Sequence, residues 1–260
     1  MKVVILCGGL GTRLREETEF RPKPMVPVGD RPILWHIMKI YAHFGFNEFI
    51  LCLGYKGEFI KDYFRNYQWN TSDVTLKLGR HPAVKYHTSH EEENWSVTLA
   101  DTGDSTATAG RIKRIQRYIG EDEHFLLTYG DGVADINIPA VIDQHVKSKK
   151  ALTLSAVHPP GRFGELGFEG ENIINLFHEK PRSEGGWING GFFVASRRLF
   201  DYLENSEKTM LEQEPLRQLA KEGELQAYRH DGFWMPMDTY QEFQNMNRIW
   251  AEGNAPWKIW

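Results

Sequence analysis

The chain has 260 residues, of which 41% are hydrophobic and 25% are charged, and its formal net charge is −4. This length allows one large α/β domain, or two small ones, with a substantial core. The charge lacks the basic excess typical of nucleic-acid-binding proteins, and no run of about 18 apolar residues indicates a membrane span. We therefore expect neither a nucleic acid nor a membrane as a partner.

The two cysteines, Cys7 and Cys52, each lie at the end or inside of a short apolar run. Buried thiols suit a reducing cytoplasm better than a disulfide framework, although a disulfide joining these two is an open alternative. The N-terminal apolar run is followed at once by glycines and lacks the cleavage site of a secretory signal. We therefore expect this run to be a strand of a cytoplasmic protein.

Apolar runs alternate with helical patterns in the first half of the chain, which is typical of βαβ units. Buried strands are predicted over residues 3–7, 49–53, 125–128, 152–157 and 188–194. Helices are predicted over residues 33–44, 59–67 and 139–149, and near 198–204 and 211–222.

Four further segments alternate in polarity as strands do. Residues 74–88 and 96–99 are predicted to form peripheral antiparallel strands, and residues 164–168 and 173–178 flank a turn and indicate a hairpin. The expected fold is thus a Rossmann-like, doubly wound α/β fold with a mixed, mostly parallel sheet, inserted β-hairpins and a helical, tryptophan-rich C-terminal part. Ligands of such sheets bind at the carboxyl ends of the strands.

A glycine-rich loop, Gly8-Gly9-Leu10-Gly11-Thr12-Arg13-Leu14, directly follows the first predicted strand. Its glycines let backbone N–H groups approach phosphate oxygens closely. A dinucleotide fingerprint is incomplete here, because Leu14 stands at its third glycine and Asp30 is a poor ribose-binding acid; a Walker loop lacks its Gly-Lys-Ser/Thr. The alternative to a phosphate loop is a tight turn with Arg13 exposed to solvent.

Lys23 lies about ten residues further on, between Pro22 and Pro24. The two prolines fix an extended backbone, which limits the entropy lost when the flexible ammonium is placed. A glycine turn followed by a rigidly placed lysine suits a triphosphate better than a dinucleotide.

With this combination the chain resembles the nucleoside-triphosphate:sugar-1-phosphate nucleotidyltransferases, whose Gly-Gly-x-Gly-Thr-Arg-Leu loop and Lys-Pro segment occur here at residues 8–14 and 23–24. Cys7 stands where the family has alanine. The resemblance runs over nearly the whole chain and implies one domain over residues 1–260, with a nucleotide-binding part in 1–135 and a sugar-phosphate-binding part with C-terminal helices in 136–260. It implies nucleotide contacts from Leu6, Gly8, Gly9, Leu10, Gly11, Thr12, Arg13, Lys23, Thr106, Arg111 and Gly130.

Two acidic residues are candidate metal ligands. Asp131 follows a predicted strand in Tyr129-Gly130-Asp131-Gly132, and Asp238 precedes a predicted helix. Taken alone, Asp131 could be a turn residue and Asp238 a helix N-cap. Two carboxylates with triphosphate oxygens make a typical Mg²⁺ site, and the resemblance implies that these two acids hold the catalytic Mg²⁺.

The segments Glu179-Lys180-Pro181 and Asn189-Gly190-Gly191 flank the start of a predicted strand. The first could be an ordinary charged turn, whereas the glycines of the second are typical of a close approach between backbone and ligand. The resemblance implies that Lys180 grips the phosphate of the sugar. It also places Tyr129, Glu179, Asn189 and Gly190 at the sugar phosphate, and makes Arg13, Lys23 and Lys180 the catalytic cations.

Several stretches, among them residues 101–105, 129–135 and 231–239, are similar to the members of this family that use CTP and glucose 1-phosphate. Cytosine presents acceptors at O2 and N3, and an arginine has only donors, so Arg111 could select cytosine over uracil while Thr106 or a backbone carbonyl accepts from N4. Arg111 could also be a solvated helix residue. The expected partners are CTP, glucose 1-phosphate and further copies of the chain.

Three other functions are open at this stage. A uridylyl- or thymidylyltransferase would share every phosphate-binding residue and differ in its base and sugar contacts. An NAD-dependent oxidoreductase would need the complete dinucleotide fingerprint, and a non-catalytic relative would have little reason to combine Arg13, Lys23, Asp131, Lys180 and Asp238.

Overall fold

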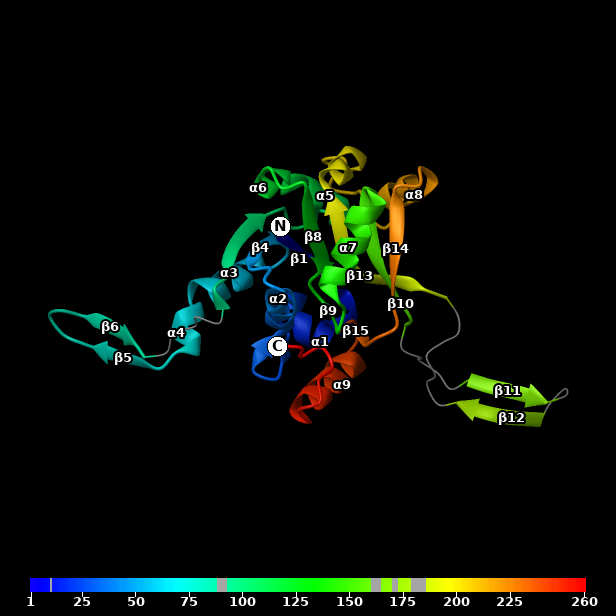
Figure 1. Cartoon of the computed structure of the whole chain (residues 1–260). Coiled ribbons are helices and arrows are strands. Elements are labelled where there is room, and N and C mark those ends of the chain that lie inside the picture. Colours follow the sequence, from blue (N-terminus) through cyan, green and yellow to red (C-terminus); the bar gives the residue numbers. More distant parts are fainter. Residues whose placement is uncertain (10, 88–92, 160–164, 170–172, 179–185) are drawn as a thin grey trace.

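A computed structural model describes residues 1–9, 11–87, 93–159, 165–169, 173–178 and 186–260. Its centre is a seven-stranded sheet with the strand order β14-β10-β13-β8-β1-β4-β7 (Figure 1). The strands are β1 (Val3–Leu6), β4 (Glu48–Leu53), β7 (Ser96–Asp101), β8 (His124–Tyr129), β10 (Leu152–Val157), β13 (Ile188–Ser196) and β14 (Leu225–His230).

The sheet is mixed and mostly parallel, as predicted. β1 pairs in parallel with β4 and β8, β4 with β7, and β10 with β14, whereas β13 runs antiparallel to both β8 and β10. The buried strands predicted from the sequence are therefore confirmed, with shifts of one or two residues at their ends.

Two edge strands differ from the prediction. Residues 96–99 were expected in a peripheral antiparallel strand, but β7 extends the main sheet and lies parallel to β4. β14, at the opposite edge, was expected as part of a helical region. Both strands are only partly buried, because an edge strand has a neighbour on one side alone. The resulting mixed polarity resembles that of a peripheral hairpin or a loop.

Helices cover both faces of the sheet, because alternate residues of each strand point to opposite faces. Val3 and Ile5 of β1 pack with α2 (Ile33–His43) and α7 (Ile138–Ser148). Val4 and Leu6 pack with α5 (Thr108–Arg114), α6 (Gln116–Ile119) and α8 (Glu214–Lys221). The doubly wound arrangement is thus confirmed. The other helices are α1 (Arg15–Thr18), α3 (Gly57–Arg65), α4 (Tyr67–Thr71), α9 (Tyr240–Ala251) and the 3₁₀ turns η1 (Thr12–Leu14), η2 (Lys23–Met25) and η4 (Arg197–Tyr202).

Short strand pairs lie outside the sheet. They are β2 (Pro27–Val28) with β3 (Arg31–Pro32), β5 (Val74–Lys77) with β6 (Ala83–Tyr86), β9 (Gly132–Ala134) with β15 (Trp234–Pro236), and β11 (Glu165–Glu169) with β12 (Ile173–His178). The predicted hairpin is confirmed as β11–β12. Figure 1 shows β5–β6 and β11–β12 projecting from opposite sides of the molecule.

A cluster of aromatic rings joins the C-terminal segment to α2. His36 is fully buried; its Nε2 lies 2.9 Å from the carbonyl oxygen of Val28, and its Nδ1 lies 3.4 Å from Nε1 of Trp257. The indole N–H can only donate, so Nδ1 accepts and Nε2 donates, and the ring is neutral. Burial lowers the pKa of His36 to about 4.

Lowering the pH from about 7 to about 4 is expected to destabilise the fold through His36, because the unfolded ring takes up a proton near pH 6.5, well before the buried ring does. The stabilising contribution of the neutral His36 ring is present at pH values above the ordinary histidine pKa. It is lost as the pH falls toward the lower pKa that the ring has in the folded protein. The full loss is about 3 kcal/mol. Urea unfolding of His36→Gln should show a flatter pH dependence than wild type over this range, whereas the exposed His43→Gln should keep the wild-type slope. Equal slopes for all three proteins would contradict the assignment.

Candidate active site

A cavity of about 280 Å³ opens at the carboxyl ends of β1 and β8. These parallel neighbours end at the same edge of the sheet, where the Gly130 N–H donates to the Leu6 carbonyl. Nine of the residues predicted at the site line this cavity: Leu6, Gly8, Gly9, Lys23, Thr106, Arg111, Tyr129, Gly130 and Asp131; Cys7, Pro24, Ala107, Thr108 and Met210 complete the wall.

Lys23 lies between the two acids that were predicted as metal ligands. Its Nζ is 2.7 Å from Oδ2 of Asp131 and 2.5 Å from Oδ1 of Asp238, and the lysine side chain is only 11% exposed. Nη1 of Arg13 lies 3.1 Å from Oδ2 of Asp238, although the arginine side chain is 72% exposed. Four predicted site residues thus meet as two cations and two carboxylates.

The local sequence explains these positions. η2 places Lys23 between Pro22 and Pro24, and the Met25 N–H donates to the Pro22 carbonyl. The Met237 N–H donates to the Asp131 carbonyl, which ties the two acidic segments together. Asp238 is not the N-cap of α9: Thr239 caps that helix in a reciprocal pair with Glu242, so the Asp238 carboxylate is directed to Lys23 and Arg13.

Opposing effects act on the ammonium of Lys23. Burial disfavours its charged form, but Asp131 and then Asp238 outweigh this, and the pKa of Lys23 is held above its ordinary value. The lysine therefore keeps its positive charge beside the cavity, which suits an anionic ligand.

The acid pair suits a hard divalent cation. Asp131 and Asp238 already share one cation, the ammonium of Lys23, so their carboxylates converge on a common point. Mg²⁺ prefers oxygen ligands and usually takes one or two carboxylates, completing its shell with water and substrate phosphates. Within the described ranges no third acidic, histidine or cysteine ligand joins the pair, which agrees with that pattern.

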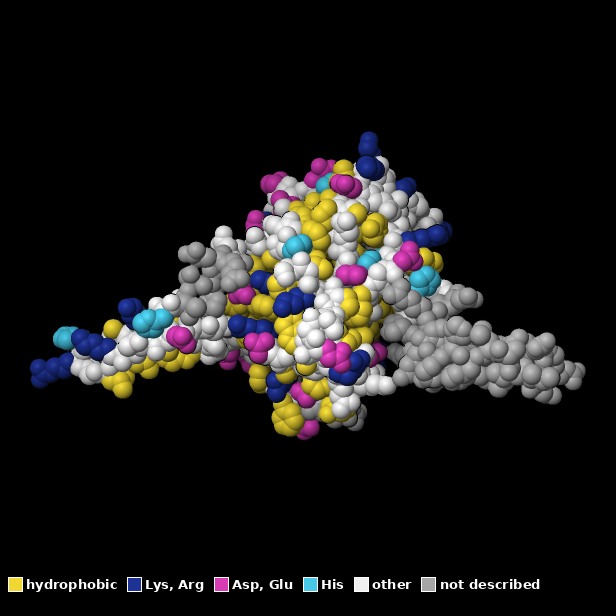
Figure 2. All heavy atoms as spheres, turned by 60° about the horizontal axis from the view of Figure 1, so that its bottom comes forward, with side chains coloured by type: hydrophobic (Ala, Val, Ile, Leu, Met, Phe, Trp, Pro, Cys, Tyr) yellow, Lys and Arg dark blue, Asp and Glu magenta, His cyan; other side chains and the backbone are white. Residues whose placement is uncertain are grey.

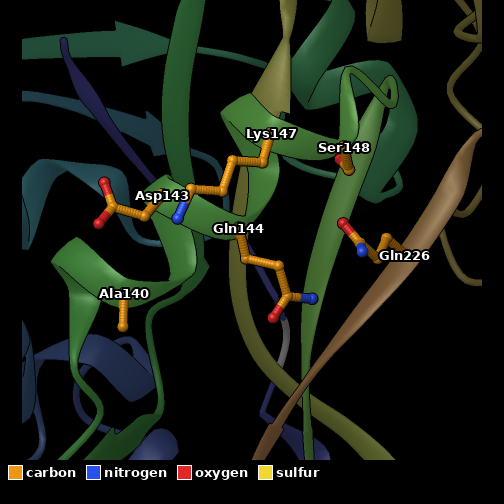
Figure 3. Close-up of a pocket in the computed structure, with 6 residues that line it drawn as sticks. All are labelled: Ala140, Asp143, Gln144, Lys147, Ser148 and Gln226. Atoms are coloured by element: carbon orange, nitrogen blue, oxygen red, sulfur yellow. The ribbon is translucent and has the colours of Figure 1, made fainter.

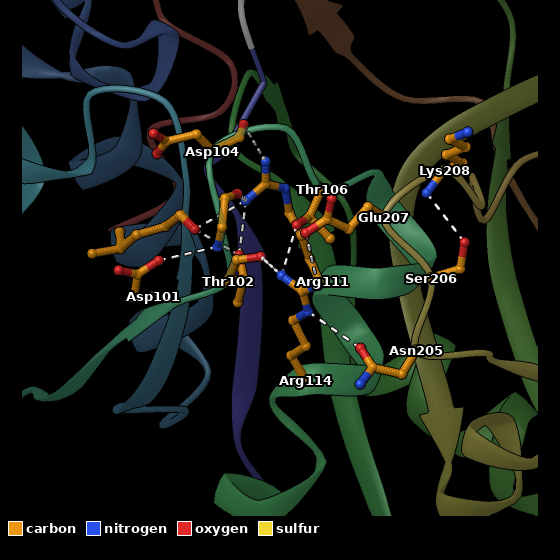
Figure 4. A network of polar contacts seen from close by, with 12 residues as sticks. Asp101, Thr102, Asp104, Thr106, Arg111, Arg114, Asn205, Ser206, Glu207 and Lys208 are labelled. Carbon is orange, nitrogen blue, oxygen red and sulfur yellow. Dashed lines mark hydrogen bonds and ion pairs between the residues drawn. The ribbon is translucent and has the colours of Figure 1, made fainter.

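Arg111 is bound to protein oxygens in this structure (Figure 4). The residue is 4% exposed. Its Nη1 donates to Leu53 O, Thr102 Oγ1 and Gly103 O, and its Nη2 donates to Gly8 O and Asp104 O, at 2.7 to 3.2 Å. The interpretation of Arg111 as a solvated helix residue is therefore wrong. Recognition of cytosine by Arg111 stays a prediction, and it requires the guanidinium to exchange some of these oxygens for O2 and N3 of the base.

Glycine is required on both sides of this guanidinium. A Cβ on Gly8 would lie 2.1 Å from Cζ of Arg111, and a Cβ on Gly54 would lie 2.3 Å from its Nη1. The glycine-rich loop therefore needs Gly8 for its packing against Arg111. Thr106 lines the same wall, where its hydroxyl accepts from Nη1 of Arg114 at 2.8 Å.

On the side predicted for the sugar, Tyr129 and Asn189 are in contact. Nδ2 of Asn189 donates to the Tyr129 hydroxyl at 3.2 Å, and the Gly190 carbonyl accepts from Nε1 of Trp234. Glu212, which the sequence analysis did not single out, accepts from the Tyr129 hydroxyl at 2.5 Å and from the Thr108 hydroxyl at 2.7 Å. Its Leu-Glu-Gln-Glu-Pro context carries no motif, so only the fold brings it to the site.

Some predicted residues are not part of this wall. Leu10, Glu179 and Lys180 lie outside the described residues. Gly11 has a positive φ of 62° and its carbonyl accepts from the Thr18 hydroxyl, which holds the loop ahead of the 3₁₀ turn that contains Thr12.

A second hollow, of about 590 Å³, lies between α7 and β14 (Figure 3). It is lined by Ala140, Asp143, Gln144, Lys147, Ser148 and Gln226, and Gln144 bonds the backbone of β14 there. None of the residues predicted at the site contributes to it, and one acid with one lysine does not provide the several cations that a triphosphate requires.

A glycine-rich loop and two carboxylates that contact Lys23 and Arg13 lie at the carboxyl edge of a doubly wound sheet. This arrangement is typical of nucleotide-binding α/β proteins. The chain belongs to the nucleotidyl transferase family, whose profile matches residues 2–252. It is 52% identical to the glucose-1-phosphate cytidylyltransferase of Salmonella typhi over 260 residues, which is 100% of both chains.

Two other proteins show how widely the fold is shared. The D-glycero-alpha-D-manno-heptose 1-phosphate guanylyltransferase of Campylobacter jejuni is 28% identical over 94% of this chain and 97% of its own. The crystal structure of HddC from Yersinia pseudotuberculosis superposes with a TM-score of 0.70 at 24% identity, over 96% of this chain and 99% of that one. The second likeness concerns the fold alone.

Proposed function

We propose that the protein transfers the cytidylyl group of CTP to glucose 1-phosphate and forms CDP-glucose and pyrophosphate. The observation that carries this proposal is the 52% identity, over 100% of both sequences, to a glucose-1-phosphate cytidylyltransferase. The arrangement of Lys23, Arg13, Asp131 and Asp238 beside the cavity supports it, because the reaction must neutralise two highly charged phosphate substrates.

In the proposed reaction a phosphate oxygen of glucose 1-phosphate attacks the α-phosphorus of CTP. A new P–O bond forms, the bond from the α-phosphorus to the oxygen bridging to the β-phosphorus breaks, and pyrophosphate leaves with that electron pair. The nucleophile is already an anion, so no general base is required. Catalysis is then mainly positioning and charge neutralisation.

Each cation has a separate task in this proposal. Lys23 and Arg13, with the N–H groups of the glycine loop, hold the triphosphate, and Lys180 holds the phosphate of the sugar. Asp131 and Asp238 would hold Mg²⁺, which supplies neutralisation of the phosphate charge when bound. Tyr129, Glu179, Asn189 and Gly190 would orient the hexose.

Lys23→Ala and Lys180→Ala are expected to separate in steady-state kinetics. Lys23→Ala should mainly impair the use of CTP, because its Nζ lies in the nucleotide cavity beside Asp131. Lys180→Ala should mainly raise the KM for glucose 1-phosphate. If both variants lost nucleotide affinity alone, the segment around Lys180 would not be the sugar-phosphate site.

We further propose that the protein is a homo-oligomer, with the arm formed by β5 and β6 as one contact. Val74 pairs with Tyr86 and Leu76 with Val84, so one face of the arm is apolar, and Leu78 at its turn is 84% exposed. Figure 2 shows hydrophobic side chains along one edge of this arm. A two-stranded ribbon is marginally stable by itself, so a partner surface would stabilise it. Light scattering of wild type and of Leu78→Ser tests the contact.

The proposed setting is a reducing cytoplasm. Cys7, directly after β1, and Cys52, on the neighbouring strand β4, are both buried free thiols, so the alternative of a disulfide between them is not borne out. Within the part of the chain that the structure describes, no helix has the length and apolarity needed to cross a bilayer.

The reaction is tested directly by its products. CTP and glucose 1-phosphate labelled with ¹⁸O in its phosphate oxygens should give CDP-glucose and unlabelled pyrophosphate, which ³¹P NMR and mass spectrometry resolve. Label in the pyrophosphate would contradict attack at the α-phosphorus, and absence of CDP-glucose would contradict the proposed function.

A further inference from the structure

We propose that Lys23 occupies the metal site of the nucleotide-free protein and leaves it when the triphosphate binds, so that nucleotide and metal bind cooperatively. This inference rests on the proposed function for the identity of the nucleotide. It concerns the order in which the site is assembled, and its test does not depend on turnover.

The ammonium of Lys23 lies between the two carboxylates that would hold the metal. Nζ of Lys23 contacts Asp131 Oδ2 and Asp238 Oδ1 at 2.7 and 2.5 Å, and Arg13 contacts the second oxygen of Asp238 at 3.1 Å. A divalent cation held by the same two carboxylates would need oxygens at about 2.0–2.1 Å from itself. The ammonium and the metal cannot both take the position between these oxygens.

The charges of this cluster balance. Arg13, Lys23, Asp131 and Asp238 form a set of two positive and two negative charges, so the carboxylates are already neutralised. A metal ion that displaced Lys23 without a nucleotide would leave the ammonium of an 11% exposed side chain without its anions. Removing one partner of a buried ion pair is strongly unfavourable, so metal alone should bind weakly.

A triphosphate changes this balance. Lys23 lines the same cavity as Gly8 and Gly9, whose backbone is suited to phosphate oxygens, so its ammonium can move from the carboxylates to the phosphates without losing an anionic partner. The carboxylates are then released for the metal. Lys23 thereby acts as a positioning residue that links the two binding events.

Mn²⁺ is a suitable probe, because its electron paramagnetic resonance signal reports the free ion. In the absence of nucleotide, Lys23→Met should bind Mn²⁺ about 10-fold or more tighter than wild type, within the range of about 5- to 150-fold typical of coupled sites. Lys56→Met is the matched control: Lys56 contacts the carbonyl oxygens of Thr18 and Glu19 instead of a carboxylate, and this variant should stay within about twofold of wild type.

The double variant Lys23→Met/Asp131→Asn tests whether the gained Mn²⁺ affinity depends on Asp131. This variant should lose the gain seen in Lys23→Met. With α,β-methylene-CTP, a non-reacting analogue, wild type should gain more Mn²⁺ affinity than Lys23→Met does. Thermal unfolding of each variant checks that it is folded.

An unchanged or weaker Mn²⁺ affinity in folded Lys23→Met would overturn the inference, as would a gain that persists in the double variant. These outcomes are distinct from failure of the proposed function. If the wild type forms CDP-glucose but Lys23→Met gains no Mn²⁺ affinity, the proposed function stands and the coupling is overturned. If Lys23→Met gains Mn²⁺ affinity but the wild type forms no CDP-glucose, the coupling stands and the proposed function is overturned.

Discussion

Asp131→Asn and Asp238→Asn are each expected to lower kcat by roughly 10²-fold or more, the scale of losing one preorganised charge partner. Asparagine keeps the size of the side chain but removes a negative charge and directs an NH₂ donor toward Lys23, which both carboxylates contact. The metal would then lose a ligand and Lys23 an anionic partner.

The measurement is the rate of pyrophosphate release at saturating Mg²⁺ and saturating substrates. Asp143→Asn is the matched control, because Asp143 is an exposed acid in the hollow between α7 and β14 and should tolerate the change. Wild-type turnover of Asp131→Asn under these conditions would remove Asp131 from the metal site.

Arg111→Ala is expected to reduce the preference for CTP over UTP by as much as ~10⁴-fold, because a site built to hydrogen-bond one base leaves groups unpaired with the wrong one. The same change removes the donors to Leu53 O, Gly103 O and Gly8 O, so the melting temperature should also fall.

The two effects of this substitution can be separated. A ratio of specificity constants measured on one preparation cancels the fraction of protein that is folded, so the CTP-to-UTP ratio reports base recognition alone. Arg117→Ala, an exposed arginine beside Tyr118 on the following helix, should change neither the ratio nor the melting temperature. If Arg111→Ala lowers the melting temperature but keeps the ratio, Arg111 supports the loop and does not recognise the base.

The fold could be predicted where the pattern is set by burial on both faces. Continuous apolar runs form β1 and the central parts of β4 and β8, because helices cover them on each side, and α2 begins directly after Pro32 as the sequence indicates. The edge strands β7 and β14 could not be assigned in the same way. Their partial exposure removes the apolar run, and pairing in parallel with a distant strand has no local signal.

The sequence indicated most residues of the candidate site, but it did not indicate how their side chains contact one another. The loop, Lys23, Asp131 and Asp238 were found because each belongs to a compact motif at the end of an element. That Lys23 lies between the two acids depends on contacts over 108 and 215 residues, and the place of Glu212 beside Tyr129 depends on the packing of the segment before α8. No sequence spacing encodes such distances.

Transfer from CTP to glucose 1-phosphate is tested by the specificity constants for CTP, UTP, dTTP and GTP with glucose 1-phosphate, measured by coupled pyrophosphate release on one preparation. We expect the specificity constant for CTP to exceed each of the others by at least about 10²-fold, since a buried polar match discriminates at that level or above. Comparable constants for CTP, UTP and dTTP would contradict the cytidylyl assignment and leave a nucleotidyltransferase of broader base selectivity.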